Sequence, residues 1–172
     1  MKSWRINELG FPWEKCLFED LALPKVPARG CRVQVEATDL NFADILQCEG
    51  KYQVSIEPPF TPGMNAAGTV IEAATDSKFQ SGDRVVGPTF EGYGGYAEEA
   101  LVIADRSTRI PEGIATLDAA AMNVTYCTAW FGLHLRGNIR PGQTILVLAA
   151  AGGVGAAAVE LAKLHGCWVI AA

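Results

Sequence analysis

Several features that would assign a function directly are scarce in this sequence. It has only two histidines, and its five cysteines are widely spaced, with no CxxC pair and no HExxH or GxSxG motif. No apolar run approaches about 20 residues, and the N-terminus lacks the apolar core of a secretory signal. These absences argue against a thiol redox motif, a zinc site of paired cysteines, a serine hydrolase and a membrane-spanning segment.

The composition indicates a cytoplasmic globular protein. Of the 172 residues, 49% are hydrophobic and 19% are charged, which is enough to bury the core of one domain, or of one domain and part of another. The net charge of −5 disfavours nucleic acid and anionic membranes as partners. An odd number of widely spaced cysteines is typical of reduced, mostly buried thiols.

The first part of the chain is rich in strand signals. Residues 31–37 alternate, with Cys31, Val33 and Val35 on one face, so they predict a half-buried strand. Prolines and a glycine in residues 24–30 indicate a stiff connection before it. One or two helical turns are predicted at 41–47. Further strands are predicted at 1–6, 15–23, 68–74, 83–86 and 96–103.

The pattern changes from residue 116 onward. Apolar residues recur with a helical period to Leu133, and a short apolar run at 145–149 then leads into a glycine-rich turn and an alanine-rich helix. Gly166 stops that helix before a second apolar run at 168–172, so the unit is the opening of a parallel βαβ. The predicted fold class is mixed β and α/β, with one domain at 1–115 and the start of another at 116–172.

The glycine-rich turn is the strongest single motif. Ala150, Gly152 and Gly155 fit the spacing G-x-G-x-x-G with alanine in the first place. Small residues there let the backbone approach a pyrophosphate and let the helix pack closely, while free N–H groups face the anion. The alternative is a turn that serves packing alone. The residue that selects NAD or NADP would lie about 20 positions further on, past Ala172.

Polar residues at 41–52 form the next candidate site. Asn41 and Asp44 lie three apart on the short helix, and Tyr52 follows in a loop. An amide that donates to a carbonyl oxygen and a phenol that contacts a flat ring would suit hydride transfer. The alternative is that Asn41 caps the helix while Asp44 and Tyr52 hold the loop.

Other chemistry-bearing residues have ordinary structural explanations. A threonine within a helix, such as Thr128, normally bonds back to its own backbone, and Cys127 is expected to be inert core. His134 and His165 are far apart and near predicted helix C-termini, where a histidine complements the helix dipole. Glu98 and Glu99 are expected to be solvated.

Six ordered segments together resemble the medium-chain dehydrogenase/reductase superfamily, and within it the zinc-independent, zeta-crystallin-like quinone oxidoreductase branch. The segments are LNFADILQCEGKYQ at 40–53, PPFTPGMNAAGTVIEA at 58–73, SGDRVVG at 81–87, GGYAEEALV at 94–102, NVTYCTAWFGL at 123–133 and RPGQTILVLAAAGGVGAAAVELAK at 140–163. Six motifs in order are far more specific than the glycine turn alone.

The resemblance implies a GroES-like β-barrel for residues 1–115 and the start of a Rossmann domain for residues 116–172. It places Asn41 and Tyr52 beside the nicotinamide and the substrate, as catalytic and cofactor-binding residues, and Thr128 against the nicotinamide. At the glycine turn it adds the cofactor-binding residues Ala151, Gly152, Gly153, Val154 and Gly155. The implied cofactor is NADPH, which the sequence does not itself distinguish from NADH.

The resemblance also implies an enzyme without metal. Zinc-dependent relatives have cysteine at the position of Asn41 and a His-Glu pair at the positions of Met64 and Asn65, so the zinc ligands are missing. Hydrogen bonds would polarise the substrate, a small quinone or enone, and the cofactor would supply the hydride chemistry. The alternatives are an enoyl or alkenal reductase of the same superfamily, and a catalytically silent GroES-like module that binds proteins.

Family members continue beyond the second Rossmann strand, with further strands and a return segment that completes the first domain. The resemblance therefore predicts that this chain is an N-terminal piece of such a protein. Two parallel strands with open edges form a marginal sheet, so we expect the chain alone to bind NADPH weakly if at all. The homodimer typical of the family is expected only if the remaining half is present.

Overall fold

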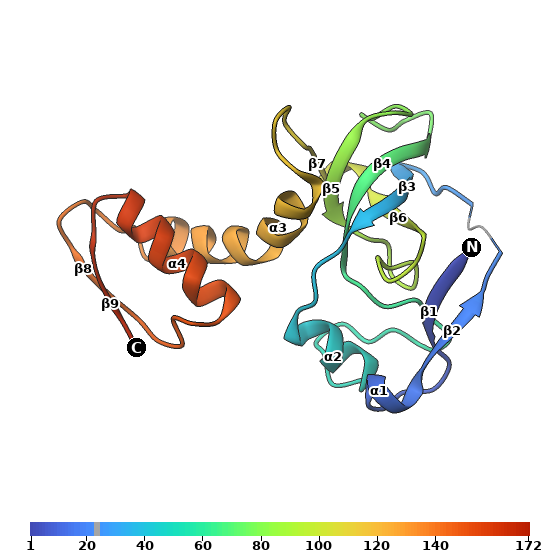
Figure 1. The fold of residues 1–172 in the computed structure, drawn as a ribbon, viewed down its shortest axis with the longest axis horizontal. Helices are drawn as coiled ribbons and strands as arrows, with labels where there is room; N and C mark the ends of the chain where they lie inside the picture. The colour runs from blue at the N-terminus through green and yellow to red at the C-terminus, as the bar shows by residue number, and fades with distance from the viewer. Residues whose placement is uncertain (23–24) are drawn as a thin grey trace. The chain divides into compact units, whose positions relative to one another are not determined.

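The computed structural model describes residues 1–22 and 25–172, and Figure 1 shows its fold. Its contacts divide it into two compact units, Met1–Ala120 and Ala121–Ala172, and each is described by itself below. Leu23, the predicted end of the second strand, and Pro24, the first proline of the predicted connection, lie outside the described residues.

The first unit is built on a five-stranded antiparallel sheet in the order β6-β3-β4-β5-β7. Its long central pair, β3 and β4, has irregular register on either side of the stretch Val33–Val35. Because β3 lies between β4 and β6, both of its edges are paired over residues 31–34. The strands are β3 (Gly30–Ala37), β4 (Asn65–Ala73), β5 (Arg84–Pro88), β6 (Glu99–Ile103) and β7 (Thr108–Arg109).

A two-stranded ribbon and two short helices complete this unit. Figure 1 shows α1 and α2 at the same end of the unit, and the N–H of Gly10 donates to the carbonyl of Cys48 at 3.0 Å, which ties the α1 segment to the end of α2. The elements are β1 (Lys2–Ile6), α1 (Pro12–Lys15), β2 (Cys16–Asp20), α2 (Phe42–Cys48) and the short η1 (Ala104–Arg106).

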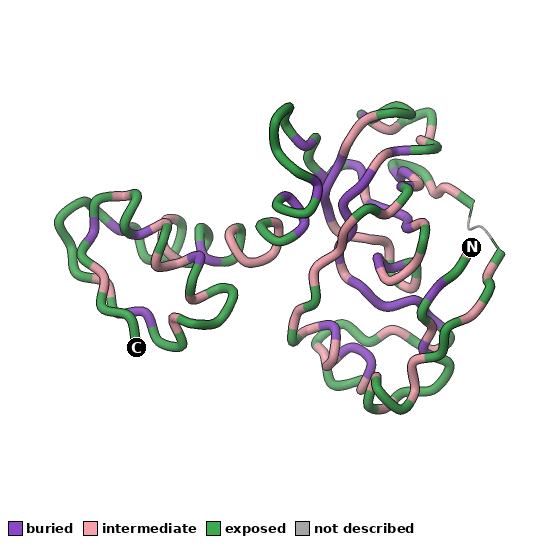
Figure 2. The backbone as a smooth tube through the Cα atoms, in the orientation of Figure 1, coloured by how far each residue is buried: buried purple, intermediate pink, exposed green. Residues whose placement is uncertain are grey.

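The core of the first unit follows the alternation seen in the sequence. Cys31 and Val33 of β3 are completely buried, whereas Gln34 is exposed, so the predicted half-buried strand is confirmed. Val70, Val85 and other small apolar residues of the sheet pack against them. Figure 2 shows the buried residues of this unit concentrated along the sheet. The burial of this apolar surface is the main force that stabilises the sheet.

The second unit contains the end of α3 (Thr116–Trp130), the π-helical segment η2 (Phe131–Arg136), and then β8 (Thr144–Val147), α4 (Gly153–Leu164) and β9 (Trp168–Ala171). Strands β8 and β9 pair in parallel, from Thr144 with Trp168 to Val147 with Ala171. The predicted βαβ unit and the mixed β and α/β fold class are confirmed. No helix in the part of the chain that the structure describes is long and apolar enough to cross a membrane.

Three predicted elements differ from the structure for identifiable reasons. The strand at 145–149 ends at Val147, because Ala149 adopts a left-handed backbone with φ of 53°. The strand at 96–103 begins only at Glu99, because the N–H of Tyr96 bonds to Pro62 and its carbonyl accepts from Trp4. The helix that begins at residue 116 changes at 131 to π-helical geometry.

The five cysteines are all free, but they differ in exposure. Cys31, Cys48 and Cys167 are buried and Cys16 is partly buried, as expected for core thiols. Cys127 on α3 is exposed, so the expectation that it is inert core is wrong. The helical period of apolar residues from residue 116 onward indicates a helix, but it does not show whether other segments cover the side of α3 on which Cys127 lies.

We therefore expect a single fast-reacting thiol in the native chain. Burial raises the pKa of Cys48 to about 12, so this thiol stays protonated at neutral pH and does not attack disulfide reagents. Titration with Ellman's reagent should show one fast thiol, and Cys127→Ser should remove it. The control Cys167→Ser changes a buried thiol and should leave the fast phase intact. A fast phase that persists in Cys127→Ser would contradict the assignment.

Candidate functional site

Tyr52 lies in the loop after α2 and lines a cavity of about 280 Å³ in the first unit. The walls are mostly apolar and include Val54, Met64, Phe90 and Ile103. This volume is just below the range of about 300 to 1,000 Å³ that is usual for small-molecule sites. The cavity therefore has room for a small ring system beside the Tyr52 phenol.

Asn41 stands at the start of α2, where it forms a capping box with Asp44. The Asp44 carboxylate accepts the N–H of Asn41 at 2.8 Å and the N–H of Met64 at 2.9 Å. The structural interpretation of Asn41 as a helix cap is therefore right. The N–H of Asp44 donates to the backbone carbonyl of Asn41 at 3.0 Å, so the two side-chain N–H donors of Asn41 are not used by the cap and remain for a ligand.

Asp44 is buried, with 1% of its surface exposed, and it connects the two parts of the candidate site. Burial raises the pKa of its carboxyl, and the N–H groups of Asn41 and Met64 act in the opposite direction. Because Met64 lines the Tyr52 cavity, the Asp44 carboxylate fixes the start of α2 relative to that cavity. The expectation that Asp44 holds the loop is confirmed.

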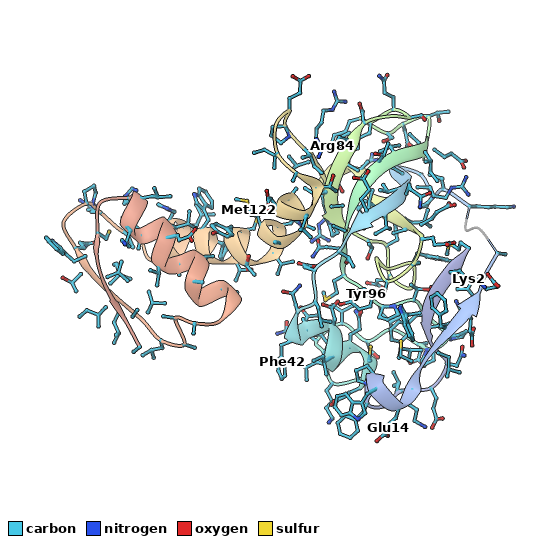
Figure 3. All side chains as sticks on the ribbon, in the orientation of Figure 1. Lys2, Glu14, Phe42, Arg84, Tyr96 and Met122 are labelled. Atoms are coloured by element: carbon cyan, nitrogen blue, oxygen red, sulfur yellow. The ribbon has the colours of Figure 1, made fainter. Side chains whose placement is uncertain are left out.

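Tyr96 reinforces the segment that precedes α2. Its hydroxyl donates to the carbonyl of Asp39 at 3.1 Å, while its own carbonyl accepts the N–H of Trp4 on β1. Figure 3, in which Tyr96 is labelled, shows it between α2 and the β1–β2 ribbon. Burial raises the pKa of the Tyr96 phenol, so it stays protonated and acts as a fixed hydrogen-bond donor.

In the second unit, the glycine turn leads directly into α4. The helix begins at Gly152 as N-cap without a side-chain hydrogen bond, and residues 151–154 are exposed. A side chain at Gly155 would place its Cβ 2.2 Å from the oxygen of Ala149 and 2.8 Å from the Cα of Ala150. Only glycine allows this close approach, and the uncapped amides suit the anionic pyrophosphate of a dinucleotide.

Helix α3 packs against this turn within the second unit. A Cβ added to Gly153 would lie 3.0 Å from Cγ2 of Thr125, and the hydroxyl of Tyr126 donates to the Glu160 carboxylate on α4. Thr125 bonds back to the carbonyl of Ala121, as expected for a threonine within a helix. Thr128 is exposed one turn further along α3. Its place against the nicotinamide stays a prediction.

The structure brings predicted residues together within each unit. In the first, Asn41 and the Tyr52 cavity are joined through Asp44, and in the second, the turn Ala151–Gly155 stands beside α3. Sequence reasoning missed Phe90 and Arg106, which line the cavity but lie far from Tyr52 along the chain. A larger groove of about 720 Å³ in the first unit contains none of the predicted site residues.

Two predictions about charged and metal-ligating residues are wrong. The rings of His134 and His165 meet edge to face, with centroids 4.8 Å apart, rather than lying far from each other. Glu99 is partly buried and lies 3.3 Å from Arg32, so it is not a solvated residue. Across residues 1–22 and 25–172, no group of three or more His, Cys, Asp or Glu side chains could hold a metal ion.

Comparison with known proteins gives the family. Residues 28–112 match the model of the alcohol dehydrogenase GroES-like domain. A quinone oxidoreductase-like protein 2 homolog from Nematostella vectensis is 42% identical over 179 residues, which cover 99% of this chain and 47% of that protein. The chain belongs to the medium-chain dehydrogenase/reductase superfamily. The resemblance found in the sequence is therefore confirmed, and the chain spans about half the length of the curated relatives it matches.

Two solved members of the superfamily have closely similar folds. The quinone oxidoreductase of Thermus thermophilus, solved also in complex with NADPH, has 37% identity and a TM-score of 0.84, over 99% of this chain and 52% of that one. The CurK enoyl reductase has 26% identity and a TM-score of 0.85, over 99% of this chain and 53% of that one. Oxidoreductase function in general is thus supported for the family to which this chain belongs.

Proposed function

We propose that this chain carries the N-terminal half of a metal-free, NADPH-dependent oxidoreductase that reduces quinones or other conjugated carbonyls. The observation that carries the proposal is the turn at the start of α4, where the Gly155 backbone lies against Ala149 and Ala150 and uncapped amides face solvent. The similarity to a quinone oxidoreductase solved with NADPH supports the choice of cofactor and acceptor.

In this proposal each residue has a defined task. The cofactor, when bound, supplies the hydride. Residues Ala151–Gly155 hold its pyrophosphate, mainly through the amides of Ala151 and Gly153–Gly155, since the N–H of Gly152 already donates to the carbonyl of Ala149 at 3.0 Å. Thr128 packs against the nicotinamide. Asn41 donates a hydrogen bond from its amide to the carbonyl oxygen of the acceptor, and the Tyr52 ring packs on the flat acceptor in its cavity.

Hydrogen bonds take the part that a zinc ion plays in zinc-dependent relatives. Asn41 and Met64 offer an amide and a thioether, which are poor ligands for zinc compared with thiolate or imidazole. As negative charge develops on the acceptor oxygen, a donor already held in place lowers the barrier without reorganisation. Asp44 holds Asn41 in that position through the backbone bond of 2.8 Å.

The test combines a binding measurement with an activity assay on the chain. Titration with NADPH should shift the NMR signals of the Gly152–Gly155 amides, with weak affinity because only two strands support the turn. Saturable binding at micromolar NADPH would overturn the expectation of weak affinity. The absence of any shift at these amides, also in a protein extended to the family's usual length, would sink the nucleotide site and favour the protein-binding module.

The acceptor is tested by following NADPH oxidation with menadione and with crotonaldehyde. Faster oxidation with menadione supports the quinone reductase. The similarity to the CurK enoyl reductase favours a second candidate, an enoyl or alkenal reductase, which would oxidise NADPH faster with crotonaldehyde. NADH in parallel assays tests the cofactor preference. A family-type homodimer stays a prediction for the longer protein.

A further inference from the structure

The Tyr52 cavity contains a positive charge whose partner is not supplied by the protein. Arg106, the last residue of η1, lines this cavity together with Tyr52 and Met64. In the part of the chain that the structure describes, its guanidinium takes part in none of the hydrogen bonds or ion pairs. A guanidinium has five N–H donors and binds carboxylates in a bidentate manner.

The charged residues near Arg106 in sequence are already paired. Asp105, its neighbour, lies 3.5 Å from Arg29, and Arg109 lies 2.6 Å from Asp83. Neither of these residues lines the Tyr52 cavity. Unlike Arg29 and Arg109, Arg106 lines this cavity and has no carboxylate partner in the part of the chain that the structure describes.

Glu91 is the other charged residue of the cavity wall, and both Glu91 and Arg106 are exposed. Glu91 also lines two further cavities. A ligand in the Tyr52 cavity therefore meets one cation and one carboxylate at solvent-accessible positions. Whether an anionic or a cationic ring binds more tightly shows which of the two governs binding.

We propose that Arg106 makes the Tyr52 cavity selective for acceptors whose ring carries a carboxylate or a similar anionic group. The proposal rests on the proposed function, since it assumes that the acceptor occupies this cavity. The apolar wall holds the ring beside Tyr52, and Arg106 binds the anionic substituent at the edge of the ring. Substrates of this class are quinones or conjugated carbonyls with an acid group.

The experiment uses redox-inert probes that differ in one group, so that no thiol reaction or hydride transfer interferes. Naphthoate, naphthamide and naphthylmethylammonium are titrated into the chain, and binding is followed through the NMR amide signals of Tyr52 and Met64. We expect naphthoate to bind roughly threefold to tenfold more tightly than naphthamide, the range for a solvent-accessible charge-assisted contact. Arg106→Gln should reduce that ratio to about one.

Arg109→Gln is the matched control, because it removes an exposed arginine outside the cavity and should leave the ratio unchanged. An equal preference in wild type and Arg106→Gln, or tightest binding by the ammonium probe, would overturn the proposal. Failure of the proposed function would give a different result. Naphthoate would still bind more tightly than naphthamide in a manner that depends on Arg106, but NADPH would not be oxidised by menadione or by crotonaldehyde. If menadione is reduced but naphthoate binds no more tightly than naphthamide, the inference about Arg106 fails and the proposed function stands.

Discussion

Gly155→Ala should destabilise the second unit by about 3 kcal/mol and abolish nucleotide binding. The added Cβ would lie 2.2 Å from the oxygen of Ala149 and 2.8 Å from the Cα of Ala150, and both are backbone atoms that cannot turn away. Helix α4 would have to move off the end of β8, which separates the amides of the turn from each other. Thermal unfolding followed by circular dichroism, and NMR signals of α4, measure the effect.

Gly132→Ala provides the matched control in the same unit. Gly132 lies in the π-helical segment, and a Cβ added there meets nothing within 4 Å. Because alanine has the higher helix propensity, this substitution should be neutral or slightly stabilising. Equal unfolding temperatures for Gly155→Ala and Gly132→Ala would show that the close approach at Gly155 does not limit the fold.

Asp44→Ala should destabilise the first unit by about 3 kcal/mol. The substitution leaves the partly buried N–H groups of Asn41 and Met64 without their acceptor, which lies at 2.8 and 2.9 Å in the native structure. Urea unfolding measures the loss. Asp105→Ala is the control, because it removes an exposed carboxylate that pairs with Arg29, and its unfolding midpoint should stay close to that of the wild type. Equal midpoints for the two variants would contradict the role of Asp44.

The pH dependence of this site follows from the burial of Asp44. Burial raises the pKa of Asp44 in the folded chain above its unfolded value of about 3.9, so the folded state binds the proton more tightly. Stability at this site is therefore lost as the pH rises from the unfolded pKa through the folded one. Relative to Asp44→Asn, the wild type should become more stable as the pH falls from neutral towards about 4. If the wild type instead becomes less stable as the pH falls, the two N–H hydrogen bonds lower the pKa of Asp44 by more than burial raises it.

Local patterns were sufficient to predict the elements that carry the two halves of the site. The alternation of apolar and polar residues at 31–37 predicted β3, and the small residues between two apolar runs predicted the turn between β8 and α4. The pairing of Asn41 with Asp44 could be predicted because the two residues of a capping box are always three positions apart. These are short-range features whose geometry depends on neighbouring residues alone.

Features that depend on distant segments could not be predicted from one sequence. The Tyr52 cavity takes Met64, Phe90 and Arg106 from different elements, and only the packed fold brings them together. The contact between His134 and His165 arises in the same way, from the end of η2 and the end of α4. The exposure of Cys127 depends on which side of α3 is covered, and its own sequence does not mark that side.

Ala149, in the turn between β8 and α4, has a backbone conformation that lowers the stability of the fold. It holds φ at 53° although it carries a Cβ, a conformation that costs roughly 1–2 kcal/mol for any residue but glycine. Glycine there would relieve that cost, yet it would also let the loop visit many shapes in which its amides diverge. The methyl group thus restricts the backbone of this turn: the chain gives up part of its folding free energy, and the turn keeps one geometry in the folded state.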